Sequence, residues 1–348
     1  DAAARGARIT TRTKVTMAQV LDGIWHVTLQ DQYSGARRTV RARFLVNAGG
    51  PWVENIIRNT IGLDTKEGVR LVRGSHIITR KLYDHDKCYF FQGQDGRIIF
   101  TIPYETDFTL IGTTDVDHQD LAEKPVCQSE EQDYLLQFAS TYLKAPVTAE
   151  DVVATYSGVR PLYNDAASSA TAATRDYVLK LDNSAGAPLL SVFGGKITTY
   201  RKLAEQALQQ ISEHAPQIGQ AWTAGVALPG GDFPVDGVEE IIHQLITKFP
   251  FLTAPWARRL VKAYGNEAFD VLGAAQLATD LGEDFGANLT AREVTWLMDK
   301  EFAQTAEDVI WRRSKLGLRL SHAQIERLQT WMQQQLTAAQ TGQAAAQA

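Results

Sequence analysis

The segment Ser191-Val192-Phe193-Gly194-Gly195-Lys196-Ile197-Thr198-Thr199-Tyr200-Arg201 reads as a buried strand, two glycines and the start of a helix. Glycines let a ligand approach the backbone closely, and the unpaired N–H groups and dipole at a helix start favour negative charge. A tight turn between a strand and a helix, with no ligand, would give the same pattern. The segment therefore favours an anion site without establishing one.

The same order of elements occurs earlier in the chain. A strand from Arg38 to Val46 ends in Asn47-Ala48-Gly49-Gly50, and the segment after it has Pro51 at a suitable first helical position. Strand patterns over 7–20 and 24–30 come before it and predict an antiparallel meander. Two units of strand, glycine pair and helix thus enclose the region between them.

The region between these units predicts an antiparallel sheet with one helix. Ser129 and Gln132 form a capping-box pattern before apolar residues at helical spacing, which predicts a helix start. Strand patterns separated by turns occur over 71–78, 88–92, 97–102, 108–111, 152–157 and 177–181. The region therefore reads as an α+β domain.

Beyond Leu228-Pro229-Gly230-Gly231 the pattern changes to helices. Capping boxes are predicted at Thr290-x-x-Glu293 and Ser321-x-x-Gln324. The alanine- and glutamine-rich end from Ala338 has no apolar periodicity, so we expect it to fray. The last part of the chain is predicted to be an all-α domain.

Composition narrows the classes of function. The 348 residues, 44% hydrophobic and 22% charged, suit two or three globular domains, and the net charge of −5 argues against a nucleic-acid partner. Cys88 and Cys127 have no metal-ligand spacing around them, so we expect no metal, no disulfide framework and a cytoplasmic protein. Since no apolar run approaches the roughly 20 residues of a membrane span, contact with a bilayer would be peripheral.

Two side chains stand where chemistry is plausible. Arg160 lies between a strand and Pro161, away from any charged helix face, and its planar fork suits phosphate or carboxylate, although a structural salt bridge is an equal alternative. His76 lies inside an apolar strand, where a hydrogen-bonded core histidine is the usual explanation. Neither residue alone establishes a site.

Five segments occur along the chain in this order: Asn47-Ala48-Gly49-Gly50-Pro51-Trp52, Arg73-Gly74-Ser75-His76, Ile111-Gly112-Thr113-Thr114-Asp115, Ser157-Gly158-Val159-Arg160-Pro161-Leu162 and Phe193-Gly194-Gly195-Lys196-Ile197-Thr198-Thr199-Tyr200-Arg201. Their order and approximate spacing resemble those of the aerobic, FAD-dependent glycerol-3-phosphate dehydrogenases. The match continues through 228–231 and 280–286 to 311–313, and so covers nearly the whole chain.

The resemblance implies a mixed α/β and α+β fold. It consists of a partial glutathione-reductase-like FAD domain, an antiparallel-sheet substrate domain inserted in it, and an all-α carboxyl-terminal domain. We assign 1–64 and 186–215 to the FAD domain, 65–185 to the substrate domain and 225–337 to the helical domain.

The resemblance also implies the site residues. Those expected to contact FAD are Ala48, Gly49, Gly50, Trp52, Arg160, Gly194, Gly195, Lys196, Ile197 and Thr198. Those expected to line the substrate pocket are His76, Arg160, Arg175 and Lys196, and the catalytic residues are expected among His76, Arg160 and Lys196. No metal ligand is implied.

The implied reaction is oxidation of sn-glycerol 3-phosphate to dihydroxyacetone phosphate, with electrons passed through the flavin to a quinone. Either His76 or a buried Lys196 could accept the hydroxyl proton, and the sequence leaves this choice open. An oxidase that uses oxygen, an amine or amino-acid oxidase, and a non-catalytic binding module are the competing functions. The sequence also leaves open whether the protein forms a homodimer and whether it lies at the inner face of the cytoplasmic membrane.

One departure from the family is large. Its members carry a Gly-x-Gly-x-x-Gly loop that receives the FAD pyrophosphate, and this sequence contains none. The sequence also begins at Asp1 and enters directly into a strand-like pattern. We therefore expect an excised carboxyl-terminal piece in which FAD binding is weak or absent and activity is lost.

Overall fold

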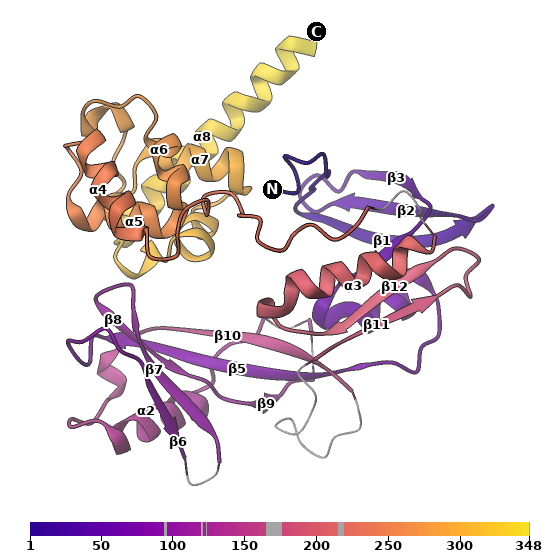
Figure 1. The fold of residues 1–348 in the computed structure, drawn as a ribbon, viewed down its shortest axis with the longest axis horizontal. Helices are drawn as coiled ribbons and strands as arrows, with labels where there is room; N and C mark the ends of the chain where they lie inside the picture. The colour runs from indigo at the N-terminus through magenta and orange to yellow at the C-terminus, as the bar shows by residue number, and fades with distance from the viewer. Residues whose placement is uncertain (94–95, 120, 123, 165–175, 215–218, 348) are drawn as a thin grey trace. The chain divides into compact units, whose positions relative to one another are not determined.

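The computed structural model describes residues 1–348 apart from 94–95, 120, 123, 165–175, 215–218 and 348 (Figure 1). The chain forms two compact units. A strand-rich unit comprises Arg12–Thr223, and a helical unit comprises Asp1–Thr11 with Ala224–Ala348. The expected order of sheet domains followed by helices is confirmed.

The first sheet of the strand-rich unit is an antiparallel meander in the order β1-β2-β3. Asp22 and Gly23 both have positive φ and make the tight turn between its first two strands. Trp25 is fully buried and its Nε1 donates to the carbonyl oxygen of Pro188 at 2.9 Å. The first strand starts later than the expected residue 7, and the bounds are β1 (Thr13–Leu21), β2 (Ile24–Asp31) and β3 (Arg37–Ala42).

A second sheet carries both glycine pairs, in the order β11-β12-β4. Buried Val53, Ile57 and Phe193 pack together beneath it. The strands are β4 (Leu45–Asn47), β11 (Tyr177–Asp182) and β12 (Leu189–Gly194). The helices that follow β4 are η1 (Gly50–Trp52), α1 (Val53–Asn55) and η2 (Ile56–Ile61), and those that follow β12 are η4 (Ile197–Thr199) and α3 (Tyr200–Ser212).

The largest sheet is antiparallel, in the order β10-β5-β8-β7-β6 with β9 beside β5. Helix α2 (Ser129–Tyr142) packs on one face, where Ile77, Ile99 and Ile111 meet Leu135. The strands are β5 (Val69–Arg80), β6 (Tyr89–Gln92), β7 (Ile98–Tyr104), β8 (Phe108–Gly112), β9 (Val116–Asp117) and β10 (Val152–Tyr163), the last preceded by η3 (Ala149–Asp151).

The start of α2 corrects one expectation. Gln128 is the N-cap, and its backbone N–H donates to Glu131 at 3.1 Å, so the predicted box of Ser129 with Gln132 is wrong by one residue. The pair Gln128 and Glu131 and the pair Ser129 and Gln132 each place an acidic or amide side chain three residues after a polar one. The sequence pattern therefore did not distinguish the two possible helix starts.

The helical unit packs around one apolar core that includes the fully buried Phe285. The predicted capping box of Ser321 with Gln324 is confirmed by a 2.8 Å bond from the Ser321 N–H to Gln324. The box of Thr290 with Glu293 is wrong, because Arg259 and Tyr264 donate to the carboxylate of Glu293 instead.

The helices of this unit are α4 (Val238–Lys248), α5 (Ala254–Tyr264), η5 (Gly265–Glu267), α6 (Ala268–Leu272), η6 (Ala278–Leu281), α7 (Ala291–Glu301), η7 (Asp308–Arg313), η8 (Leu316–Leu318) and α8 (His322–Gln347). The last helix continues past Ala338, where fraying was expected, because alanine and glutamine both favour helix. Across the described residues, no helix combines the length and apolar character that membrane crossing requires.

Candidate active site

The two glycine pairs lie at the same edge of one sheet. Strands β4 and β12 are parallel neighbours, with Asn47 opposite Ser191, so the chain leaves both strands at their carboxyl ends. In sheets with parallel strands, ligands bind at the edge where the carboxyl ends lie. The structure thus brings Ala48, Gly49 and Gly50 together with Gly194 and Gly195, as a shared ligand site requires.

Backbone conformation explains why glycine is needed here. Gly50, Gly194 and Gly195 have φ of +55°, +70° and +93°, values that other residues adopt with strain. A Cβ on Gly194 would also lie 3.0 Å from the carbonyl oxygen of Asp176, whereas a Cβ on Gly50 would meet no atom within 4 Å. The loop after β4 therefore has open space at Gly50, whereas at Gly49 the side chains of Ile56 and Asn47 leave no room for a Cβ.

Apolar side chains next to both loops are exposed. The exposed fractions are 51% for Trp52 and 85% for Ile197. Lys196 and Thr198 are exposed as well. Large apolar side chains open to solvent are typical of a surface that a ligand covers.

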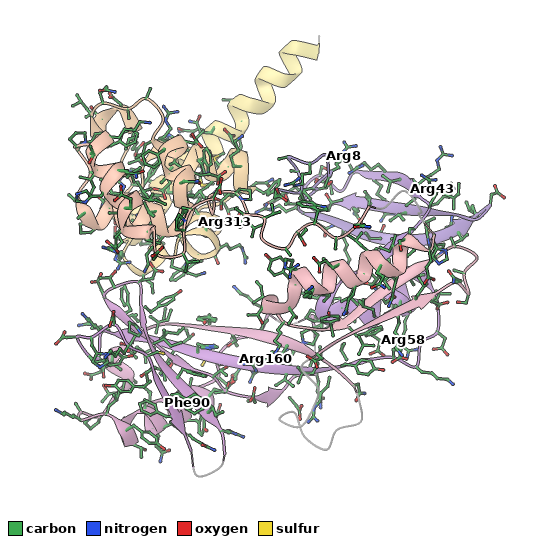
Figure 2. All side chains as sticks on the ribbon, in the orientation of Figure 1. Arg8, Arg43, Arg58, Phe90, Arg160 and Arg313 are labelled. Carbon is green, nitrogen blue, oxygen red and sulfur yellow. The ribbon has the colours of Figure 1, made fainter. Side chains whose placement is uncertain are left out.

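Two predicted residues, His76 and Arg160, share one face of the largest sheet, opposite to the face covered by α2. Residues two apart on a strand point to the same side, so Gly74 and His76 of β5 lie on one face, as do Tyr156 and Arg160 of β10. The pairing of His76 with Tyr156 joins these two rows. Figure 2 labels Arg160 on this part of the sheet.

The imidazole of His76 stands between a tyrosine and a glycine. Its ring stacks on that of Tyr156, with centroids 4.8 Å apart and planes 5° from parallel. On the neighbouring strand, a Cβ on Gly112 would lie 2.7 Å from Cγ and Nε2 of the imidazole. The imidazole occupies the space that a side chain at position 112 would fill, so only glycine fits there.

Burial determines the charge state of His76. Its Nδ1 is buried and has no hydrogen-bond partner among the described residues. Burial, followed by the nearby Arg160 cation, lowers the pKa of His76 to about 4. The imidazole is therefore neutral at pH 7 and able to accept a proton.

This charge state gives a testable pH dependence. An unfolded histidine takes up its proton near pH 6.5 and His76 only near 4, so the unfolded chain binds more protons between these values. We therefore expect the folded state to lose up to about 3 kcal/mol of stability as the pH falls through this range. Urea unfolding at pH 7 and 4.5 should show a larger loss for the chain than for His76→Gln, because carboxyl groups with a lowered pKa contribute to the loss in both. An NMR titration midpoint near 6.5 for His76 would contradict the prediction.

The guanidinium of Arg160 is held by one short segment. Nη1 pairs with Asp115 at 2.6 Å, and Nη2 donates to Oγ1 of Thr113 at 3.0 Å. The group lies over Gly74, where an added Cβ would be 2.6 Å from Nη1. The sequence gives no sign that Gly74, Thr113 and Asp115 would surround Arg160. Their contacts with it form only when strands that are distant in the sequence lie side by side.

The remaining predicted residues divide into two groups. Lys196 follows Gly195 directly and is exposed. Arg175 lies outside the described residues. The structure therefore brings His76 and Arg160 to one sheet face, and the roles of His76, Arg160 and Lys196 stay predictions.

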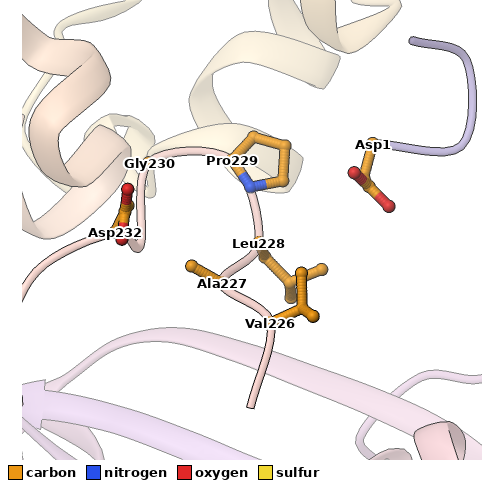
Figure 3. Close-up of a pocket in the computed structure, with 7 residues that line it drawn as sticks. All are labelled: Asp1, Val226, Ala227, Leu228, Pro229, Gly230 and Asp232. Atoms are coloured by element: carbon orange, nitrogen blue, oxygen red, sulfur yellow. The ribbon is translucent and has the colours of Figure 1, made fainter. Parts of the chain in front are cut away.

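A separate hollow of about 480 Å³ lies in the helical unit, lined by Asp1, Asp232 and the segment 226–230 (Figure 3). It contains none of the predicted site residues. Its lining carries two carboxylates, Asp1 and Asp232, and no other charged side chain, and we assign it no role.

Comparisons with known proteins agree with this arrangement. The chain is 44% identical to a glycerol-3-phosphate dehydrogenase of Pseudomonas aeruginosa over 94% of its own length and 64% of that protein. It is 40% identical to the aerobic glycerol-3-phosphate dehydrogenase of Escherichia coli, and 41% identical to the D-erythritol 1-phosphate dehydrogenase of Brucella abortus, covering 66% of each. The chain thus spans slightly less than two thirds of the length of these relatives.

A solved structure of the glycerol-3-phosphate dehydrogenase from Bacillus halodurans complexed with FAD superposes with a TM-score of 0.76 and 25% identity, covering 97% of this chain and 70% of that one. Residues 221–342 match the model of the C-terminal domain of alpha-glycerophosphate oxidase. Residues 1–201, more than half of the chain, match the FAD dependent oxidoreductase model, and the chain therefore belongs to this family.

Proposed function

We propose that this chain provides the substrate site of an enzyme that oxidises sn-glycerol 3-phosphate to dihydroxyacetone phosphate with FAD as cofactor. The observation that carries the proposal is the neutral imidazole of His76 beside the fixed guanidinium of Arg160 on one sheet face. The names of the relatives from Pseudomonas aeruginosa and Escherichia coli support this choice of substrate.

The edge that carries the glycine pairs fits FAD. Open space beside Gly50 and the exposed side chains of Trp52 and Ile197 suit a large, flat, partly apolar ring. FAD would supply the hydride acceptor for C2 of the substrate. The residues that would hold it are Ala48, Gly49, Gly50, Trp52, Arg160, Gly194, Gly195, Lys196, Ile197 and Thr198.

Two residues of the chain would take up the hydroxyl proton of the substrate and stabilise the negative charge that develops on its oxygen. Arg160 donates to a substrate oxygen and favours loss of the hydroxyl proton, since a cation stabilises the developing alkoxide. A ring nitrogen of His76 accepts that proton. The exposure of Lys196 supports His76 in this role, and leaves Lys196 to contact substrate or cofactor.

A second substrate is supported by one comparison. The relative from Brucella abortus, whose name specifies D-erythritol 1-phosphate, is as similar to this chain as the glycerol-3-phosphate dehydrogenases are. Both compounds are phosphorylated polyols, so the same cation and base would serve either one. Comparing kcat/KM for the two substrates decides between them in the flavin-loaded enzyme, by which we mean this chain extended by an amino-terminal segment with a Gly-x-Gly-x-x-Gly loop and then loaded with FAD.

We propose a quinone as the electron acceptor, with peripheral contact to the inner face of the cytoplasmic membrane and a homodimer as extensions of the same proposal. An assay of the flavin-loaded enzyme with a soluble quinone and with oxygen tests the acceptor. Faster turnover with oxygen would assign the chain to an oxidase, as the match to the alpha-glycerophosphate oxidase model would then suggest. Absence of turnover with every substrate and acceptor would favour a non-catalytic binding function.

Arg160→Lys is expected to raise KM for glycerol 3-phosphate and to lower kcat. An ammonium cannot bridge Thr113 and Asp115 while also presenting a planar fork to the substrate. The loss of one charge-assisted contact should cost about 1.5 to 3 kcal/mol in kcat/KM. Steady-state kinetics of the flavin-loaded enzyme measure this, with Arg58→Lys, a change of an exposed cation, as control. Unchanged constants would remove Arg160 from the site.

A further inference from the structure

A buried carboxylate lies behind the candidate site, on the face of the sheet that α2 covers. Glu131 is 5% exposed. Its Oε1 accepts from Thr114 at 2.6 Å and from Ser75 at 2.8 Å, and its Oε2 pairs with Arg73 at 2.9 Å. The carboxylate therefore ties α2 to β5 and to the segment that follows β8.

The charged form of Glu131 is the stable one despite its burial. Burial alone would raise the pKa of this carboxyl, but hydrogen bonds from Thr114, the Gln128 backbone and Ser75, together with the Arg73 cation, lower it overall. Ser75 also shares a 2.8 Å hydroxyl contact with Ser157 of β10. The network thus reaches the strand that carries Arg160.

The segment Thr113–Asp115 connects the two faces of the sheet. Thr113 and Asp115 bind the guanidinium of Arg160 on the site face, whereas the side chain of Thr114 between them binds Glu131 on the α2 face. The Thr114 hydroxyl also accepts from the Ser75 N–H at 2.9 Å. A shift of Thr114 would therefore move both partners of Arg160 together.

We propose that Glu131 is a positioning residue for the substrate site, which acts by fixing Thr113–Asp115 and through it the guanidinium of Arg160. The inference rests on the proposed function, because it takes Arg160 to bind substrate. Glu131 would touch neither substrate nor flavin. Its removal should therefore change KM and kcat in the same directions as Arg160→Lys does, and by less.

The test combines single and double variants of the flavin-loaded enzyme. Glu131→Gln keeps the size of the side chain and removes its charge, and we expect about a tenfold rise in KM for glycerol 3-phosphate together with a smaller fall in kcat. Thr114→Val should act alike, and Thr114→Ser, which keeps the hydroxyl, should resemble the parent. Glu130→Gln, an exposed neighbour on the same helix, is the matched control.

The double variant Glu131→Gln with Arg160→Lys separates positioning from general destabilisation. If Glu131 acts through Arg160, its effect on KM should fall below about twofold in the Arg160→Lys background, whereas independent effects would multiply and overturn the proposal. Calorimetric titration with glycerol 3-phosphate gives the same comparison as dissociation constants. If Glu131→Gln does not fold, the pair Thr114→Val and Thr114→Ser carries the test.

The two proposals fail differently. If Arg160→Lys leaves KM and the dissociation constant unchanged, Arg160 is outside the site and the proposed function loses its main support. If Arg160→Lys raises both constants while Glu131→Gln and Thr114→Val change neither, the positioning role of Glu131 alone is wrong.

Discussion

Gly112→Ala is expected to lower kcat/KM for glycerol 3-phosphate about a hundredfold, equivalent to about 2.7 kcal/mol. The added methyl would lie 2.7 Å from Nε2 of His76, well inside normal contact distance. The ring cannot move away toward the neighbouring strand, because Tyr156 already stacks against it. The imidazole must therefore leave the position from which it would accept the hydroxyl proton.

The measurement is steady-state kinetics of the flavin-loaded enzyme, with thermal unfolding to follow the cost of overpacking, typically about 1 to 3 kcal/mol. Gly219→Ala is the matched control, because a Cβ there meets no atom within 4 Å. In a His76→Asn background the alanine should have little further effect on kcat. An equal loss in both backgrounds would mean that Gly112 acts through the fold and not through His76.

Local signals in the sequence predicted the elements of the site well. The glycine pairs after Asn47 and Phe193 each follow an apolar strand, and the structure places both at the ends of strands. That β4 and β12 are parallel neighbours could not be read from either segment, because strand pairing depends on the packing of the whole sheet. The resemblance to a family supplied that part of the fold.

Contacts between side chains on different strands were the main feature of the site that could not be predicted from the sequence. Asp115 and Thr113 reach Arg160, and Glu131 reaches Arg73, only because β5, β8 and β10 align in one register. The sequence pattern at this helix start drew attention to Ser129 and Gln132 and gave no role to Glu131. The burial of His76 and the exposure of Lys196 are likewise properties of the packed structure that neither local sequence contains.

Titration of the chain with FAD is expected to show no tight binding. The loops at 48–50 and 194–198 would provide contacts for a flat ring, but the sequence holds no Gly-x-Gly-x-x-Gly loop to receive a pyrophosphate. Backbone N–H groups at a helix start are the usual partners of that doubly charged group, and without them its desolvation is not offset. The affinity should therefore be weaker than about micromolar, which corresponds to about −8 kcal/mol.

Flavin fluorescence during the titration measures this affinity, and a pair of variants locates any weak binding that remains. Ile197→Asp changes a side chain that is 85% exposed, so it should preserve the fold while placing negative charge and poor apolar contact where the ring would lie. Val235→Asp makes the same change at a fully exposed residue of the helical unit and serves as control. Weak binding that is lost only with Ile197→Asp would place the ring at the glycine edge. A stoichiometric complex of micromolar affinity or better would show that the segments around residues 48–50 and 194–198 form a sufficient flavin site without a pyrophosphate loop.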